Sequence, residues 1–267
     1  MKVRQRIVSP AQIVGIIILT AAAVSFFINP QLAAAIAFFY IVLCIVACFF
    51  PETNFLCPVI NRGNTGKNLV ALTFDDGPTQ AITRQILDLL DRYSVPATFF
   101  ITGINAAHLP EIIKEIIARG HTVGNHSFHH DSFLMLKSSK IIYQEISTAQ
   151  EVLQKMGIHM MAFRPPVGIV NPKLAPILEK LGMYCIIFSC RAADIGNRRV
   201  KGISRKIIKK VKADDIILLH DVLPRRKEDQ EILLVEIENL LSGLKAKGLT
   251  VVPLSVLIGK EIMIADN

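Results

Sequence analysis

The sequence contains no tryptophan and only four tyrosines. Proteins that hold long glycans or nucleic-acid strands in a surface groove stack successive rings on aromatic side chains. We therefore do not expect an extended groove of that kind. The basic clusters at 198–201 and 206–212 lack interleaved aromatic residues and are interpreted as solvated helix faces, so nucleic acid is not an expected partner.

Charged side chains are also missing from residues 7–50, whereas the whole chain has a formal net charge of +8. This uncharged segment divides into two apolar runs, 7–28 and 32–50. Each run is close to the about 20 residues that a helix needs to cross a bilayer. Asn29-Pro30-Gln31 between them is a turn signal. The sequence thus predicts an N-terminal transmembrane helical hairpin in a multi-pass protein of the cell (inner) membrane.

Residues 1–50 are assigned to the hairpin, 51–67 to a polar linker and 68–267 to one large domain. Two other interpretations of the front stay open. One is a cleaved signal peptide, although its apolar region is only about 7–15 residues long. The other is a hairpin that enters the bilayer without crossing it.

Basic residues near the hairpin bear on the side of the membrane. Lys2, Arg4 and Arg6 favour the cytoplasm by the positive-inside rule. Two crossings return the chain to the same side, and Arg62 and Lys67 agree with that direction. The charge therefore favours a cytoplasmic domain next to anionic lipid headgroups.

Cysteine is scarce, and its pattern predicts neither a disulfide nor a metal site. Cys44 and Cys48 lie in the second apolar run, and Cys57, Cys185 and Cys190 show no paired metal-binding spacing. We expect reduced, structural thiols.

Beyond residue 68, short β-type runs alternate with longer helical ones. Strands are expected at 69–74, 98–101, 121–124, 184–189, 216–220 and 249–252, and helices at 81–92, 111–119, 139–156, 172–181, 200–211 and 230–247. The strands are almost entirely apolar, as in parallel sheets that are covered on both faces. The pattern predicts an α/β fold with a parallel sheet or barrel, in which functional residues lie at the carboxyl ends of the strands.

Four polar clusters fall at such strand ends. The first, TFDDGP at 73–78, ends an apolar strand with two adjacent carboxylates, Asp75 and Asp76. Neighbouring side chains of an extended strand point apart, so the two acids can serve different roles on the rim of one site. A simple turn is the other interpretation, since Asp and Gly-Pro are common in turns.

The second cluster, GNHSFHH at 124–130, holds three of the seven histidines of the chain. On a helical turn His126 and His130, four residues apart, would face the same way, and this is a metal-chelating spacing. His129 is three residues from His126 and competes for the same role. A surface loop that happens to be rich in histidine is the simpler interpretation.

The other two clusters each present one chemically useful side chain. FRPPVG carries Arg164, which can bind a carboxylate in bidentate fashion, in a loop fixed by two prolines. In that loop Val167 has a backbone N–H to donate, whereas Pro166 has none. IILLHD delivers His220 at the end of a buried strand. Taken singly, a surface Arg in a rigid loop and a core or capping His explain these clusters as well.

Taken together, the clusters resemble those of the NodB-homology polysaccharide deacetylases, which form carbohydrate esterase family 4. The resemblance covers about residues 68–258. It implies a distorted (β/α) barrel of fewer than eight strands. It also implies that Asp76, His126 and His130 hold a divalent metal, usually zinc.

The same resemblance implies a hydrolytic mechanism for N-acetyl, or less readily O-acetyl, groups of a sugar. A site with one carboxylate and two histidines leaves metal positions open for water and substrate. The implied catalytic roles are a base, its orienting partner and a general acid, assigned to Asp75, Arg164 and His220. The backbone N–H of Val167 would stabilise the oxyanion, and Leu218 and Leu219 would line a small pocket for the acyl methyl group.

Two stretches depart from the family pattern. Val167 stands where the family usually has Tyr, so the backbone role remains and the sugar-facing ring is lost. The family pattern D-x-x-D-W is replaced by RAADI at 191–195, of which only Asp194 matches. We hypothesise that Asp194 supports His220, and that Arg191 can instead bind an anionic group of the substrate.

The missing tryptophan and the apolar hairpin favour a small or lipid-linked sugar over a long glycan as substrate. The expected protein is a membrane-anchored, metal-dependent carbohydrate N-deacetylase, although the family more often works outside the cell. Two alternatives stay open. One is a catalytically inactive, membrane-tethered sugar-binding or scaffold protein, suggested by the altered fourth motif. The other is a deformylase of a lipid-linked aminosugar.

Overall fold

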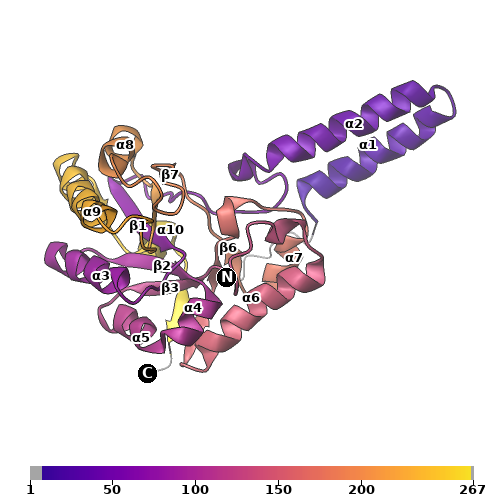
Figure 1. Ribbon diagram of the computed structural model, residues 1–267. Coiled ribbons are helices and arrows are strands. Elements are labelled where there is room, and N and C mark those ends of the chain that lie inside the picture. Colours follow the sequence, from indigo (N-terminus) through magenta and orange to yellow (C-terminus); the bar gives the residue numbers. More distant parts are fainter. Residues whose placement is uncertain (1–7, 266–267) are drawn as a thin grey trace.

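The computed structural model describes residues 8–265, and a long pair of helices projects from its α/β domain (Figure 1). Helices α1 (Pro10–Phe26) and α2 (Pro30–Ala47) form this hairpin. At the turn, the side chain of Asn29 accepts hydrogen bonds from the backbone N–H groups of Gln31 and Leu32. The two apolar runs are therefore helical over most of their length. Ile7 and the basic residues Lys2, Arg4 and Arg6 lie outside the described residues.

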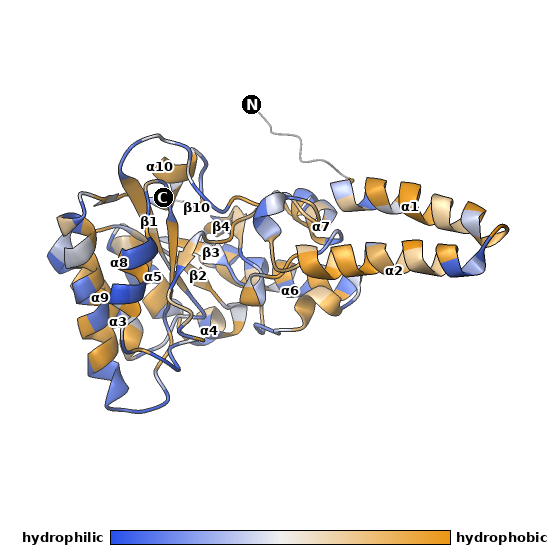
Figure 2. Ribbon diagram, turned by 90° about the horizontal axis from the view of Figure 1, so that it is seen from above, coloured by the Kyte–Doolittle hydropathy of each residue, from blue (hydrophilic) through white to orange (hydrophobic). Residues whose placement is uncertain are grey.

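The hairpin consists mostly of hydrophobic residues (Figure 2), and many of their side chains are exposed. Helix α2 has 18 residues, of which 11% are buried, and α1 is slightly shorter with 17 residues. At about 1.5 Å per residue α2 is about 27 Å long, close to the about 30 Å of a hydrocarbon core. Among the described residues α2 is the helix that is long and apolar enough to cross a membrane. An N-terminal signal sequence can meet the same criteria of length and hydropathy, so this helix alone does not fix how the chain meets a membrane.

The domain is built on a sheet in which every strand pairing is parallel. Seven strands follow one path in the order β6-β5-β3-β2-β1-β8-β7, and β9 pairs with the start of β1. Their bounds are β1 Leu69–Asp75, β2 Ala97–Ile101, β3 Thr122–Asn125, β5 Ala162–Phe163, β6 Tyr184–Cys185, β7 Cys190–Arg191, β8 Ile216–His220 and β9 Thr250–Val251. The predicted α/β barrel with fewer than eight strands along its path is confirmed. A separate antiparallel pair joins β4 (Ile158–Met160) to β10 (Met263–Ala265).

Helices pack around this sheet (Figure 1). They are α3 Ile82–Tyr93, α4 Gly103–His108, α5 Pro110–Ala118, α6 Ser139–Gln154, α7 Leu174–Lys180, α8 Ile203–Lys210, α9 Asp229–Ala246 and α10 Leu254–Ile258. Alternate residues of a strand point to opposite faces, which gives the domain two apolar cores. On β8, Ile217 and Leu219 belong to the large core beneath the helices, whereas Ile216 belongs to a smaller inner cluster with Phe100 and Tyr184. All five cysteines are free, as the sequence predicts.

Parallel register brings the carboxyl ends of the strands to one edge of the sheet. Asp75, the last residue of β1, is aligned with Phe100 of β2 and with His220, the last residue of β8. Asn125, the last residue of β3, is aligned with Phe163, the last residue of β5. The four polar clusters of the sequence therefore meet at this edge.

The segment between the hairpin and β1, which we expected to be a polar linker, packs on the domain. Leu56 is 4% exposed. Ile60 forms a parallel bridge with Ile186 beside β6, and Arg62 forms an antiparallel bridge with Asp215 just before β8. The guanidinium of Arg62 also lies 2.7 Å from the carboxylate of Asp215. Residues 60–62 thus span the gap between the two ends of the curved sheet.

Candidate active site

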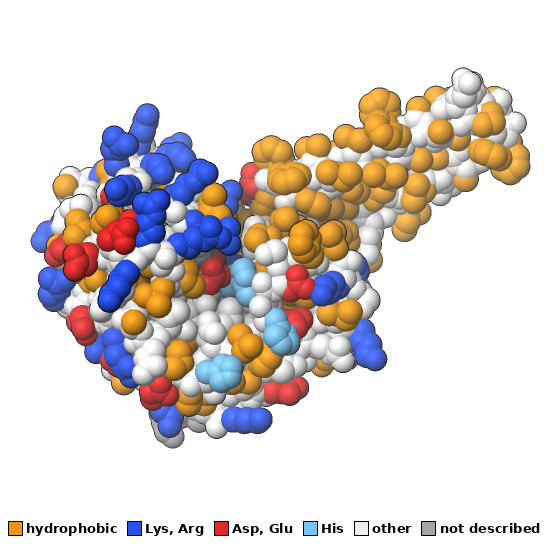
Figure 3. Space-filling model, in the orientation of Figure 1, with side chains coloured by type: hydrophobic (Ala, Val, Ile, Leu, Met, Phe, Trp, Pro, Cys, Tyr) orange, Lys and Arg blue, Asp and Glu red, His pale blue; other side chains and the backbone are white. Residues whose placement is uncertain are grey.

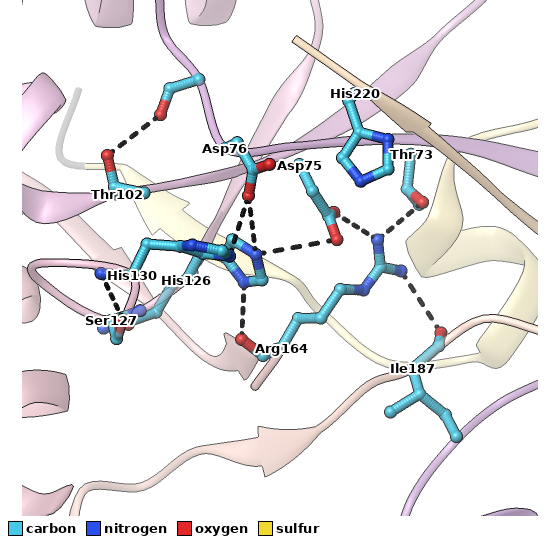
Figure 4. Close-up of polar contacts among 12 residues, drawn as sticks. Thr73, Asp75, Asp76, Thr102, His126, Ser127, His130, Arg164, Ile187 and His220 are labelled. Carbon is cyan, nitrogen blue, oxygen red and sulfur yellow. Dashed lines mark hydrogen bonds and ion pairs between the residues drawn. The ribbon is translucent and has the colours of Figure 1, made fainter. Parts of the chain in front are cut away.

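Three side chains of the metal-binding type converge at the carboxyl edge of the sheet (Figure 4). Oδ1 of Asp76 lies 3.3 Å from Nε2 of His126 and 3.0 Å from Nε2 of His130. One ligand atom from each residue lies within 4.8 Å of the others. The structure therefore brings together the three residues that the resemblance assigns to a metal.

A loop, and not a helical turn, brings the two histidines together. His126 follows β3, and residues 126–130 are not helical. Ser127 and His130 adopt left-handed backbone conformations, with φ of 64° and 56°. The Ser127 hydroxyl accepts a hydrogen bond from the backbone N–H of His130 at 3.1 Å. The expectation that a helical turn brings His126 and His130 together is therefore wrong, although the side chains of both residues do point toward Asp76.

The hydrogen bonds of His126 show that this site suits a cation. Its Nδ1 lies 2.7 Å from the backbone carbonyl oxygen of Arg164, which can only accept, so Nδ1 carries the hydrogen. Nε2 then faces the carboxylates of Asp76 and Asp75, 3.3 Å and 3.8 Å away. Burial lowers the pKa of His126, but the charges of Asp75 and Asp76 and the hydrogen bond with Asp76 outweigh burial, so the net pKa is raised. This arrangement needs a positive charge between the groups, which either a proton on Nε2 or a bound cation supplies. One carboxylate and two imidazoles suit Zn²⁺ and other divalent transition metals.

The charge state of Asp76 agrees with a cation site. Burial raises its pKa, but the hydrogen bond with His126 and the positive charges of nearby histidines outweigh burial. The net effect holds the pKa of Asp76 well below its usual range, so the carboxylate is ionised at neutral pH.

His129, the competing histidine, points away from the site. Its Nδ1 lies 2.7 Å from Oε1 of Glu145 on α6, and its side chain is 59% exposed. The structure therefore resolves the ambiguity among the three clustered histidines by giving His129 a partner elsewhere.

A fully buried arginine holds Asp75 in place. Nη1 of Arg164 donates to Oδ1 of Asp75 at 2.6 Å and to the hydroxyl of Thr73 at 2.8 Å, and Nη2 donates to the carbonyl of Ile187 at 3.3 Å. The guanidinium lies 3.9 Å from the centroid of the Phe100 ring. Burial lowers the pKa of Arg164, and the charge of Asp75 opposes this shift. Because the guanidinium binds one oxygen of Asp75, the other oxygen remains for chemistry in the cavity.

Asp194 and His220 form a second pair of interacting side chains beside Asp75, because His220 ends β8 and Asp75 ends the neighbouring strand β1. Nδ1 of His220 lies 2.6 Å from Oδ2 of Asp194, and Asp194 is 2% exposed. Burial lowers the pKa of His220, but the hydrogen bond and charge of Asp194 and the charges of Asp75 and Asp76 outweigh it, so the net pKa is raised. The Asp194 contact leaves Nε2 of His220 free on the other side of the ring.

Sequence reasoning missed Asn197, which fixes this pair. Its backbone N–H donates to Oδ2 of Asp194 at 3.3 Å, and its side-chain amide donates to the carbonyl of His220 at 2.9 Å. Asn197 has a left-handed φ of 58°, a conformation that Asn tolerates better than most residues. The asparagine in the run DIGN was the available signal.

These groups line one open cavity of about 600 Å³, hollowed into the face seen in Figure 3. Val167 lines it with a left-handed φ of 55°, and its backbone N–H donates no hydrogen bond to any residue between 8 and 265. Leu218 also lines the cavity. Leu219 does not, because the next residue of a strand faces the other way and this side chain packs in the large core. Of the two leucines that we expected to line the acyl pocket, the structure thus places Leu218 in the cavity wall and Leu219 in the core.

The fold and the site together define an α/β-barrel protein with a carboxylate–histidine cluster of the metal-binding type, flanked by an acid and a histidine. Residues 62–186 match the family model described as polysaccharide deacetylase. The chain is 30% identical to a peptidoglycan-N-acetylglucosamine deacetylase of Bacillus cereus over 194 residues, which cover 72% of this chain and 89% of the relative. The chain therefore belongs to the polysaccharide deacetylase family, as the resemblance predicted.

Two further comparisons define the extent of the likeness. The peptidoglycan-N-acetylglucosamine deacetylase PgdA of Listeria monocytogenes serotype 1/2a is 30% identical over 210 residues, or 79% of this chain. The matched region spans only 43% of that relative's length. The solved chitin deacetylase of the fungus Colletotrichum lindemuthianum has a TM-score of 0.67 and 27% identity, covering 76% of this chain and 92% of that one.

Substitutions of His130 and His129 should show which of these two histidines binds the metal. We expect His130→Ala to reduce bound Zn²⁺ severalfold after equilibrium dialysis, because one of three protein ligands is lost. His129→Ala, which removes an exposed ring held by Glu145, should bind the metal as the parent protein does. Metal loss in His129→Ala together with retention in His130→Ala would contradict the ligand assignment.

Proposed function

We propose that this chain is a membrane-anchored, metal-dependent deacetylase that hydrolyses N-acetyl groups of a carbohydrate or glycolipid. The observation that carries the proposal is the alignment of Asp75 with His220 on neighbouring strands, beside the site formed by Asp76, His126 and His130. The names of the relatives, which include peptidoglycan and chitin deacetylases, support the reaction class. When bound at this site, a divalent cation lowers the pKa of water and polarises the acyl carbonyl.

Asp75 is the proposed general base. Its Oδ1 is held by Arg164 at 2.6 Å, so the carboxylate cannot rotate freely. Its Oδ2 lies on the side of the cation site, 3.8 Å from Nε2 of His126. This oxygen takes the proton of the attacking water while the new C–O bond forms.

His220 is the proposed general acid. Its Nδ1 is held by Asp194, so Nε2 is the nitrogen that gives a proton to the departing amine as the C–N bond breaks. A raised pKa keeps this imidazole protonated closer to neutral pH. The products are a carboxylate and a free amino sugar.

Val167 and Leu218 are the proposed acyl contacts. The unpaired backbone N–H of Val167 can donate to the oxygen that becomes negative in the tetrahedral intermediate. Leu218 lies on the cavity side of β8, next in line to His220 on the same face, and gives the acyl methyl an apolar neighbour. Both contacts lie on the wall of the cavity that also holds the base and the acid.

The two alternative functions make different demands on this site. The altered motif at 191–195 suggests an inactive scaffold. The hydrogen bond between Asp194 and His220 argues against a scaffold, because it holds the proposed general acid in place. A deformylase would use the same base and acid on a smaller acyl group, so activity on formyl and acetyl substrates has to be compared.

Asp75→Asn tests the enzyme against the scaffold. Loss of a general base should lower kcat for release of acetate from tri-N-acetylchitotriose by about 10²–10⁴-fold. Zn²⁺ content should be retained because Asp75 is not one of the three proposed ligands. His129→Ala is the matched control and should keep full activity. If the parent protein binds metal yet is as inert as Asp75→Asn on both acetylated and formylated sugars, the scaffold interpretation is correct.

Asp194→Asn tests the acid through the pH dependence of kcat/KM. The acid works only when protonated, so activity falls as pH rises through the pKa of His220. Asp194 raises that pKa, and removing its charge should therefore move the alkaline limb of the profile to lower pH. A purely structural role of Asp194 would lower the rate at all pH values without moving the limb.

The proposed anchor is the helical hairpin. Its apolar side chains are exposed over its length, including Phe38 at 61% and Phe39 at 71%, and a bilayer is the environment that covers such a surface. The backbone N–H of Ala11 donates to the carbonyl of Phe55 at 3.0 Å, so the start of α1 and the domain lie at the same end of the hairpin. With the positive-inside rule, this supports a cytoplasmic domain.

Labelling of an exposed residue tests that orientation. In a Lys209→Cys variant, a membrane-impermeant maleimide should label inverted inner-membrane vesicles and not intact spheroplasts. Labelling of intact spheroplasts would place the domain outside. Release of the full chain by alkaline carbonate would show that the hairpin is not inserted.

A further inference from the structure

Arg191 stands between the catalytic cavity and the base of the apolar hairpin. A second cleft of about 160 Å³ shares Val167, Gly168, Phe188 and Arg191 with the catalytic cavity. The opposite wall of this cleft comes from the end of the hairpin, where the lining residues are Cys48, Phe49, Pro51 and Glu52. A path therefore leads from the catalytic groups, past one guanidinium, to the end of α2.

Two arginines line the catalytic cavity, and one of them, Arg191, also lines the cleft at the hairpin. Arg191 is exposed and lies 5.1 Å from the centroid of the Phe188 ring, and Arg198 lines the same cavity. Neither forms an ion pair with any described residue. Elsewhere in the domain, Arg62, Arg84 and Arg119 each bind carboxylates. An unpaired guanidinium beside a catalytic cavity is suited to an anionic group of the substrate.

The positive surface continues outward from Arg198. A neighbouring cleft is lined by five basic side chains and one acidic one, Asp229. The basic residues are Arg198, Arg199, Lys201, Arg225 and Arg226. Figure 3 shows Lys and Arg side chains gathered above the hollow of the site, at the upper left of the domain where Figure 1 places α8. This field attracts anions toward the cavity.

We propose that Arg191 and Arg198 form a phosphate subsite, and that the substrate is a sugar joined through phosphate to an apolar chain. The acylated sugar occupies the catalytic cavity, the phosphate lies at Arg191, and the apolar chain leaves along Phe49 at the end of α2 toward the bilayer. This substrate class rests on the proposed deacetylase function. It also explains how a protein without tryptophan holds a sugar, because the phosphate and the chain replace aromatic stacking as the main source of affinity.

Four substrates separate the contribution of the phosphate from that of the chain. They are the methyl glycoside of N-acetylglucosamine, N-acetylglucosamine 1-phosphate, the dodecyl glycoside, and a prenyl-phosphate-linked N-acetylglucosamine, the last two in the same detergent micelles. With the full-length metal-loaded protein, we expect phosphate to raise kcat/KM by about tenfold or more within each pair, the range for a hydrogen bond to a charged group. The lipid-linked phosphate should be the best of the four.

Arg191→Gln should abolish the gain from phosphate, so that kcat/KM becomes about equal for the two members of each pair. Lys209→Gln, which removes one positive charge from α8 away from these clefts, is the matched control and should keep the gain. A gain that survives Arg191→Gln, or no gain in either pair, overturns the phosphate subsite. A phosphate gain without any preference for the prenyl-linked substrate overturns the lipid-linked class.

A binding measurement tests the phosphate subsite independently of the proposed deacetylase activity. If the metal-loaded protein turns over none of the four substrates, the deacetylase function fails. The subsite is then tested by equilibrium binding of N-acetylglucosamine 1-phosphate to the parent protein and to Arg191→Gln. A loss of affinity of about tenfold supports the subsite, and equal affinities overturn it.

Discussion

The buried guanidinium of Arg164 is the interaction on which the rest of the site depends. A charge with no solvent exposure has to be paired and hydrogen-bonded, because its transfer from water is otherwise very costly. Its two Nη atoms meet this need with Asp75, Thr73 and Ile187, while Nε has no hydrogen-bond partner among the described residues. Its backbone carbonyl accepts from His126. One residue thus orients the proposed base and fixes the tautomer of a proposed metal ligand.

The parallel sheet supplies the geometry that this residue exploits. Asp75 and His220 end neighbouring strands in register, so the proposed base and acid are about one strand spacing apart without any loop having to place them. The less regular parts of the site carry the strain. Asp76, Ser127, His130 and Val167 all adopt left-handed backbone conformations at this edge, and strained conformations of this kind persist where the surrounding structure fixes them.

The hairpin and the cavity are parts of one arrangement. The segment 51–67 packs on the domain and bridges both ends of the curved sheet, so the base of the hairpin is held beside the cavity. With the proposed anchor, a domain attached in this way would reach sugars within a short distance of a bilayer surface. Its positive surface beside the cavity would fit the proposed substrates, which carry negative charge.

The sequence by itself determined the fold class, the apolar front and the chemical groups of the site, because strand periodicity and the four polar strand ends are local properties. It also selected Asp76, His126 and His130, although the helical reason given for the last two was wrong. Only the tertiary structure decided which neighbour does what: that His129 turns to Glu145, that Leu219 packs in the core while Leu218 faces the cavity, and that Asn197 holds Asp194 against His220. These outcomes depend on the direction in which a side chain leaves the backbone and on contacts between residues distant in the chain, and neither is written in local spacing.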